Sequence, residues 1–155
     1  MHTVPHLADL LAPDRVLVGL DVASREAALD AAVGLVAGLP AVHDPDRLRA
    51  DIAAREATLS TGVGEGLALP HARTPAVTAT VAAMCTLAAP VDWDAHDGTP
   101  VDLVLLFAGP EVERSAHVRL LAHVSRLLSP AATRRRLAAA RTPADLLAIL
   151  ASAGG

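Results

Sequence analysis

The sequence predicts a single α/β domain, residues 1–155, with a mixed β-sheet of about five strands flanked by helices on both faces. Three observations support this class. Apolar residues make up 52% of the chain, which is enough to build one full core. Short runs typical of strands are interleaved with segments of helical periodicity. The strand expected at 101–108 is apolar enough to be covered on both of its faces.

The first part of the chain predicts one strand and three helical segments. A helical turn is expected at 7–11, and the β-branched run at 15–20 predicts a strand. Ser24 stands where a helix over 24–39 needs an N-cap, and Asp44 with Pro45 predicts the start of the next helix. In that next helix, Leu48 and Ile52 are expected to face inward. For the helix over 24–39, the spacing predicts an inward face of Ala27, Ala28, Ala31, Leu35 and Leu39.

The second part begins with a glycine-rich loop at 59–66 and a brief apolar stretch at 67–69 that ends at Pro70 and His71. Strands are predicted at 77–87 and 101–108. Trp93 lies between them, either in the core or at a rim. Helices are expected over 115–128, 131–139 and 143–150, but the order of the strands is not readable. The inward stripe of the first of these helices is predicted to be Val118, Leu121, Val124 and Leu128.

Composition excludes several classes of function. The net charge is -4 and aromatic residues make up 1%, which argues against nucleic-acid binding because basic and stacking surfaces are lacking. No apolar run reaches the roughly 18 residues of a membrane helix, and the N-terminus lacks the basic region of a signal peptide. Cys85 is the one cysteine, so an internal disulfide and a paired-cysteine metal site are excluded, and a core position is expected for it. We therefore expect a cytoplasmic protein with no direct membrane insertion.

Three side chains are candidates for chemistry. His71 follows Pro70, a rigid mount, at the end of an apolar stretch, and a largely neutral imidazole is a nucleophile. His117 is expected in the first turn of a helix, where an anion is stabilised by the helix dipole. Arg55 is expected near the end of a helix, and a guanidinium can hold phosphate oxygens bidentately. Each has a structural alternative. His71 would be a turn residue with no function, His117 would be a solvent-exposed residue at the helix start, and Arg55 would bind the last carbonyls of its helix.

Other motifs give little support to a cofactor or a metal. The glycines at 62, 64 and 66 match neither a dinucleotide fingerprint nor a P-loop, and we expect them to let the backbone pass close to His71. No HExxH, paired-cysteine or GxSxG pattern is present. A metal-dependent hydrolase using both candidate histidines with Asp92 or Asp94 remains a minor alternative.

The run from Arg55 to His71 (REATLSTGVGEGLALPH) resembles the signature of the type-2 enzyme IIA domain. This is the fructose/mannitol and nitrogen-regulatory class of the bacterial phosphoenolpyruvate-dependent phosphotransferase system. Further similarity lies at 97–104, at 116–121 around His117, and at 137–150, so the resemblance covers about residues 7–150.

The resemblance implies a phosphoryl carrier that needs no cofactor and no metal. His71 would be phosphorylated through Nε2, and His117 and Arg55 would steady the phosphoryl group. The donor would be the phosphocarrier protein HPr, and the acceptor would be a cysteine, other than Cys85, on a separate enzyme IIB partner that serves sugar uptake. An apolar rim for both partners is expected from Val63, Leu67, Leu69 and Ala72.

The same motif also occurs in the nitrogen-regulatory branch. The alternative is therefore a regulatory interaction protein that is switched by phosphorylation of the same histidine. The sequence names neither the sugar nor the permease, and it leaves the oligomeric state open.

Overall fold

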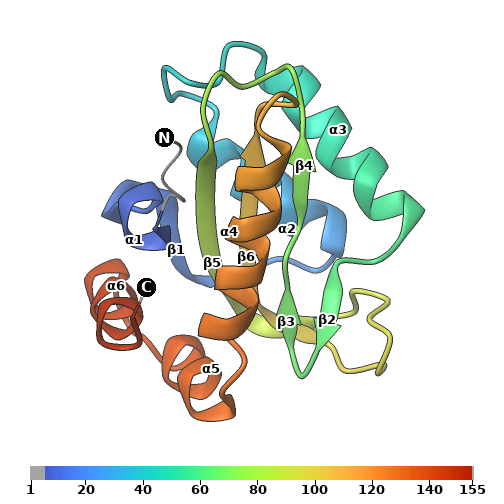
Figure 1. The fold of residues 1–155 in the computed structure, drawn as a ribbon. Coiled ribbons are helices and arrows are strands. Elements are labelled where there is room, and N and C mark those ends of the chain that lie inside the picture. The colour runs from blue at the N-terminus through green and yellow to red at the C-terminus, as the bar shows by residue number, and fades with distance from the viewer. Residues whose placement is uncertain (1–5, 155) are drawn as a thin grey trace.

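A computed structural model describes residues 6–154, so the first five residues of the N-terminal segment lie outside the described part. Its centre is a six-stranded mixed sheet with the order β1-β5-β6-β3-β2, and β4 pairs beside β6 (Figure 1). The pairs β5–β6 and β2–β3 are antiparallel, whereas β1–β5, β3–β6 and β4–β6 are parallel. The strands are β1 (Val16–Leu20), β2 (Gly62–Gly64), β3 (Leu67–Ala68), β4 (His71–Arg73), β5 (Val81–Val91) and β6 (Val101–Gly109).

Helices cover both faces of this sheet, which confirms the predicted α/β class with a mixed sheet. One face packs against α2 (Arg25–Val36) and α3 (Pro45–Thr58). The other packs against α1 (Leu7–Leu10), α4 (Arg114–Leu127), α5 (Ala131–Ala138) and α6 (Pro143–Ser152), and a 3₁₀ turn, η1 (Pro13–Arg15), precedes β1. Two short strands were not among the expected segments: β2 forms inside the glycine-rich loop and pairs with β3, and β4 begins at His71 and pairs with β6.

The predicted helix starts are confirmed. The Ser24 hydroxyl accepts a hydrogen bond from the amide of Ala27, and the Asp44 carboxylate accepts one from the amide of Arg47. Pro45 occupies the first turn of α3, where its missing N–H breaks no helical hydrogen bond. Leu48 and Ile52 of α3 are buried, as their spacing predicts. These caps satisfy amide groups that a helix leaves free at its N-terminus, and so they fix where α2 and α3 begin.

The predicted inward face of α2 is confirmed in part. Of the five expected residues, Ala28 is buried and Leu35 and Leu39 are half-buried against the same core, but the helix also buries Leu29, Ala32, Val33 and Val36. The four alanines of the helix lie within about 140° of arc, and the larger Leu29, Val33 and Val36 next to that arc set the buried face. In α4 the error is smaller, because Val124 and Leu128 are buried but Val118 is 57% exposed.

Two further expectations are corrected or resolved around β5. The strand begins at Val81 rather than Val77, because Val77 instead forms an isolated antiparallel bridge with Val42. Trp93 is fully buried, which resolves its position in favour of the core. Cys85 is buried in β5, as expected, and burial raises the pKa of its thiol to about 12. The thiol is therefore protonated and unreactive at neutral pH.

Candidate functional site

The short strand β4 presents His71 on the face of the sheet that α4 covers. Parallel pairing sets His71 opposite Phe107 of β6, so the two side chains share one face. Their rings stack with centroids 5.2 Å apart and planes inclined by only 10°. His71 was expected at the end of the preceding apolar stretch, but it begins a strand of its own. The phenyl ring supports one face of the imidazole and leaves the edge of the imidazole free.

A backbone carbonyl fixes the tautomer of His71. Its Nδ1 lies 2.7 Å from the carbonyl oxygen of Leu69, which can only accept a hydrogen bond. Nδ1 therefore carries the proton and Nε2 keeps its lone pair. Burial is the largest cause that lowers the pKa of His71, and the positive charge of Arg55 lowers it further, while the Leu69 carbonyl and Glu56 act in the opposite direction. The ring is consequently a neutral imidazole with Nε2 available as a nucleophile near pH 7.

The second histidine comes from the first turns of α4. The His117 ring lies 5.4 Å from the His71 ring and 5.2 Å from the Phe107 ring, between centroids. The side chain is buried, and its Nδ1 has no hydrogen-bond partner within the described residues. Burial, followed by the charges of His71 and Arg73, lowers the pKa of His117 to about 4. His117 is therefore neutral at pH 7, and it lies beside His71 rather than being a solvated cap.

Arg55 lies in the last turn of α3, and α3 packs next to β4. One guanidinium nitrogen of Arg55 donates to the carbonyl of Leu59 over 2.9 Å, which is the helix-end contact that the alternative interpretation predicted. The same charge is close enough to lower the pKa of His71. The structure thus brings the two histidines into van der Waals range and places Arg55 within electrostatic range of His71.

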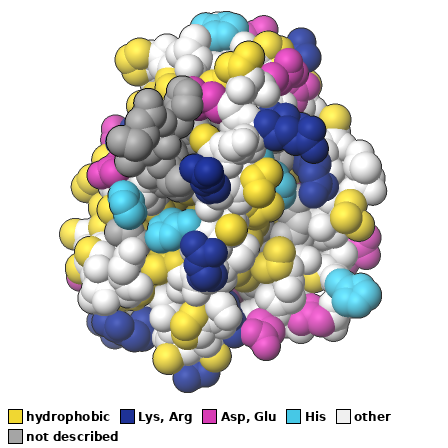
Figure 2. Space-filling model, viewed as in Figure 1, with side chains coloured by type: hydrophobic (Ala, Val, Ile, Leu, Met, Phe, Trp, Pro, Cys, Tyr) yellow, Lys and Arg dark blue, Asp and Glu magenta, His cyan; other side chains and the backbone are white. Residues whose placement is uncertain are grey.

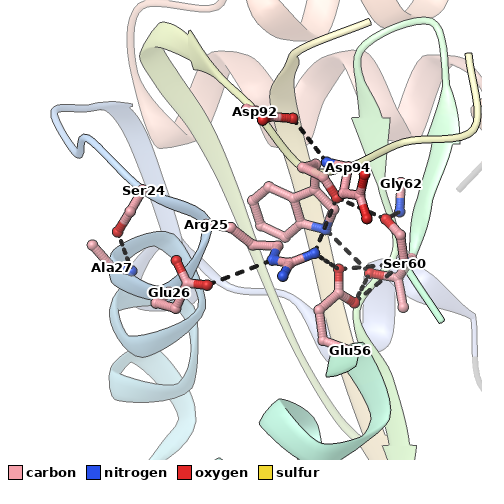
Figure 3. A network of polar contacts seen from close by, with 11 residues as sticks. Ser24, Arg25, Glu26, Ala27, Glu56, Ser60, Gly62, Asp92 and Asp94 are labelled. Atoms are coloured by element: carbon pink, nitrogen blue, oxygen red, sulfur yellow. Dashed lines mark hydrogen bonds and ion pairs between the residues drawn. The ribbon is translucent and has the colours of Figure 1, made fainter. Parts of the chain in front are cut away.

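A buried carboxylate next to Arg55 was missed by the sequence analysis. Glu56 is 4% exposed and accepts hydrogen bonds from the amide and the hydroxyl of Thr61, and its carboxylate forms an ion pair with Arg25 at 3.9 Å (Figure 3). The carbonyl of Thr61 in turn accepts the amide of Leu69, whose own carbonyl orients His71. Glu56 therefore anchors the backbone segment on which the tautomer of His71 depends.

The glycines of the 62–66 segment approach a different neighbour from the one expected. A Cβ at Gly62 would lie 2.8 Å from the Cβ of Ala95, and a Cβ at Gly66 would lie 3.1 Å from a carboxylate oxygen of Asp102. Gly66 also has a φ of +87°, which side chains rarely allow. These glycines thus let the hairpin pack on the 95–100 loop and the start of β6, not on His71.

The expected apolar rim is mostly buried. Of its four residues only Val63 is exposed, at 58% of its surface, whereas Leu67 and Leu69 belong to the core. Ala72 is buried on the opposite face of the sheet, because neighbouring residues of a strand point to opposite sides.

Within residues 6–154, no group of three or more His, Cys, Asp or Glu side chains is arranged to hold a metal ion. Asp92 and Asp94 lie between β5 and β6, where the Asp92 carboxylate accepts the amide of Asp94. None of the helices described is both long and apolar enough to cross a membrane.

The fold and site define a class of α/β domain that presents one neutral imidazole, with its Nε2 lone pair free, at the edge of a mixed sheet, beside a second imidazole. The chain belongs to the family described as "Phosphoenolpyruvate-dependent sugar phosphotransferase system, EIIA 2", which it matches over residues 9–153. It is 36% identical over 144 residues to a nitrogen regulatory protein of Pseudomonas aeruginosa, covering 93% of this chain and 94% of that protein.

Solved structures share this fold. The nitrogen regulatory protein IIA-Ntr of Neisseria meningitidis superposes with a TM-score of 0.86 at 26% identity, covering 93% of this chain and 98% of that one. The enzyme IIA of mannitol from Escherichia coli, in its complex with phosphorylated enzyme IIB, superposes with a TM-score of 0.78 at 21% identity, covering 92% and 97%. The expected membership of the enzyme IIA family is therefore confirmed.

Proposed function

We propose that this chain accepts a phosphoryl group on Nε2 of His71 from the phosphohistidine form of HPr and passes it to a cysteine of an enzyme IIB partner. The observation that carries the proposal is the hydrogen bond from Nδ1 of His71 to the Leu69 carbonyl, which leaves Nε2 as the free nucleophile. In the transfer, the N–P bond of the donor breaks as the new N–P bond forms at Nε2. The donor imidazole recovers its lone pair.

The surroundings of His71 suit such a transfer. Phosphoryl transfer between two nucleophiles depends mainly on positioning and on neutralising charge. The Phe107 ring holds the imidazole in one orientation, and Arg55 supplies positive charge. His117 is neutral, so one of its ring nitrogens carries a proton that it can donate to a phosphoryl oxygen. We assign His71 as the nucleophile, and His117 and Arg55 as the groups that steady the phosphoryl group.

The test is phosphorylation with phosphoenolpyruvate, enzyme I and HPr. We expect one acid-labile phosphate in the wild type and none in His71→Ala. His123→Ala is the matched control, because His123 also lies on α4 but its ring contacts His6 instead of the site. Stoichiometric uptake of phosphate by His71→Ala would refute the assignment.

A second candidate is a regulatory switch, in which phosphorylation of His71 changes the partner that binds and no sugar is transported. The relatives named nitrogen regulatory protein, which this chain matches over nearly their full length, favour this candidate. Pull-downs with the phosphorylated and unphosphorylated forms discriminate the two. Equal affinity of both forms for every partner would exclude the switch, and transfer of phosphate to an enzyme IIB would support sugar uptake. In both cases the chain would act in the cytoplasm, as expected from the sequence.

A further inference from the structure

Arg73 occupies a position that the proposed function leaves unused. It is the last residue of β4, two residues after His71, so both side chains emerge on the same face of the sheet about 7 Å apart. Arg73 is exposed, and within residues 6–154 its guanidinium takes part in no hydrogen bond or ion pair with another side chain. An arginine side chain is long enough to span that separation. It is therefore a free cation on the same face of the sheet as His71.

The pairing of β4 with β6 places His117 next to Arg73. The residue opposite Arg73 is Gly109, which has no side chain. A Cβ built on Gly109 would lie 3.6 Å from Nδ1 of His117, so the His117 ring fills the space above Gly109. Arg73 and His117 are thus lateral neighbours on one face. The positive charge of Arg73 is accordingly one of the causes that lower the pKa of His117.

Basic side chains also gather on this face of the molecule. In Figure 2, which has the view of Figure 1, they lie over α4 and beside the upper part of β4, next to a recessed histidine. Arg55 lies on α3, which packs on the other face of the sheet, and its positive charge acts on His71 from there. A phosphoryl group on Nε2 of His71 would therefore meet one guanidinium from each side of β4.

We propose, resting on phosphorylation of His71, that Arg73 is a second phosphoryl-binding residue, whose guanidinium contacts the phosphoryl oxygens on the His117 side. A guanidinium binds such oxygens through charge-assisted hydrogen bonds, and two arginines on opposite sides share the negative charge of the group. The contact exists only in the phosphorylated protein. Arg73 therefore stabilises phospho-His71 relative to the free imidazole, and it shifts the balance between phospho-HPr and this chain.

The equilibrium constant of transfer between HPr and this chain tests the proposal. Docking of HPr changes forward and reverse rates together, so a residue that acts only in docking leaves the equilibrium constant unchanged. Contact with the phosphoryl group changes it. We expect Arg73→Gln to shift the equilibrium toward phospho-HPr by about 10-fold, and Arg73→Lys by less, because lysine keeps the charge but not the bidentate geometry.

The matched control is Arg119→Gln, which removes the same charge from an exposed site on α4. Arg119 is two residues beyond His117, about 200° around the helix, so it points away from the site. We expect this variant to keep the wild-type equilibrium. A second measurement is the pKa of His117 by ¹⁵N NMR in the free protein, which we expect Arg73→Gln to raise and Arg119→Gln to leave unchanged.

The outcomes separate the two proposals. An unchanged equilibrium constant in phosphorylated Arg73→Gln, or an equal shift in Arg119→Gln, would overturn the role of Arg73 and leave phosphorylation of His71 intact. If the wild type took no phosphate from phospho-HPr, both proposals would fail. A slower transfer with an unchanged equilibrium would instead identify Arg73 as a docking residue and overturn the phosphoryl contact.

Discussion

Phosphorylation of His71 should change the protonation of His117. In the free protein the pKa of His117 is about 4, so the ring is neutral throughout the physiological range. The two ring centroids are 5.4 Å apart. At an effective dielectric constant of about 20, one negative charge at such a distance stabilises the imidazolium by about 3 kcal/mol. That energy corresponds to a rise of ~2 in the pKa per unit of charge. We therefore expect the pKa of His117 to rise to about 6 or higher when His71 carries a phosphoryl group.

The assay is a ¹⁵N NMR titration of the histidine rings from pH 9 to pH 5.5, with and without phosphorylation. The free protein should show a neutral His117 over the whole range, and the phosphorylated protein should show a largely protonated one at pH 5.5. His123 serves as the internal control, because it lies on the same helix but contacts His6. A neutral His117 at pH 5.5 in the phosphorylated protein would refute the argument that this ring compensates the phosphoryl charge.

Three further predictions concern stability. Glu56→Ala should destabilise the protein by about 3 kcal/mol in urea unfolding, since it leaves the buried Thr61 amide without an acceptor; an unchanged midpoint would contradict the anchoring role. Gly66→Ala should lower the free energy of unfolding by about 1–2 kcal/mol, because Gly66 has a positive φ. Gly34→Ala should leave it unchanged or raise it, because Gly34 lies in a helix with open space around it. Because the fold lowers the pKa of His117, the unfolded chain binds more protons between about pH 4 and pH 6.5. Stability should thus increase with pH across that window and level off above it, and His117→Asn should flatten the rise.

Local signals predicted most of the fold. Ser24 and Asp44 mark helix starts because each accepts a hydrogen bond from an amide three residues later, and Pro45 fits the first helical position. Such local signals can be recognised without the tertiary structure. The strand order could not be predicted from the sequence, because β1 pairs with β5 and β4 pairs with β6 across long stretches of chain. The inward face of α2 was also misassigned in part, since Leu29, Val33 and Val36, next to the alanine-rich arc, are the larger apolar side chains and set the buried face.

Some residues of the candidate site could likewise be predicted from local sequence, whereas others could be identified only from the fold. His71, His117 and Arg55 stand in recognisable motifs, so the sequence indicates them. Glu56 was missed because its partners come from elements that only the fold brings together. Phe107 looks like any other apolar residue of a buried strand, and its role depends on its register with His71. No local signal distinguishes it from its neighbours.

The alternation of side-chain size along β6 explains why the two histidines meet at this place. Phe107 fills the position opposite His71 and supports that ring by stacking. Two residues further along β6, Gly109 has no side chain on the same face. The imidazole of His117, which comes from α4, packs over Gly109 in that space. A Cβ at Gly109 would lie 3.2 Å from the Thr80 hydroxyl, a tight contact, and 3.6 Å from Nδ1 of His117, so a larger side chain would have to share this space with the ring. The spacing of the two rings is therefore set by one large and one absent side chain on a central strand, and β4 carries the nucleophile at the matching register.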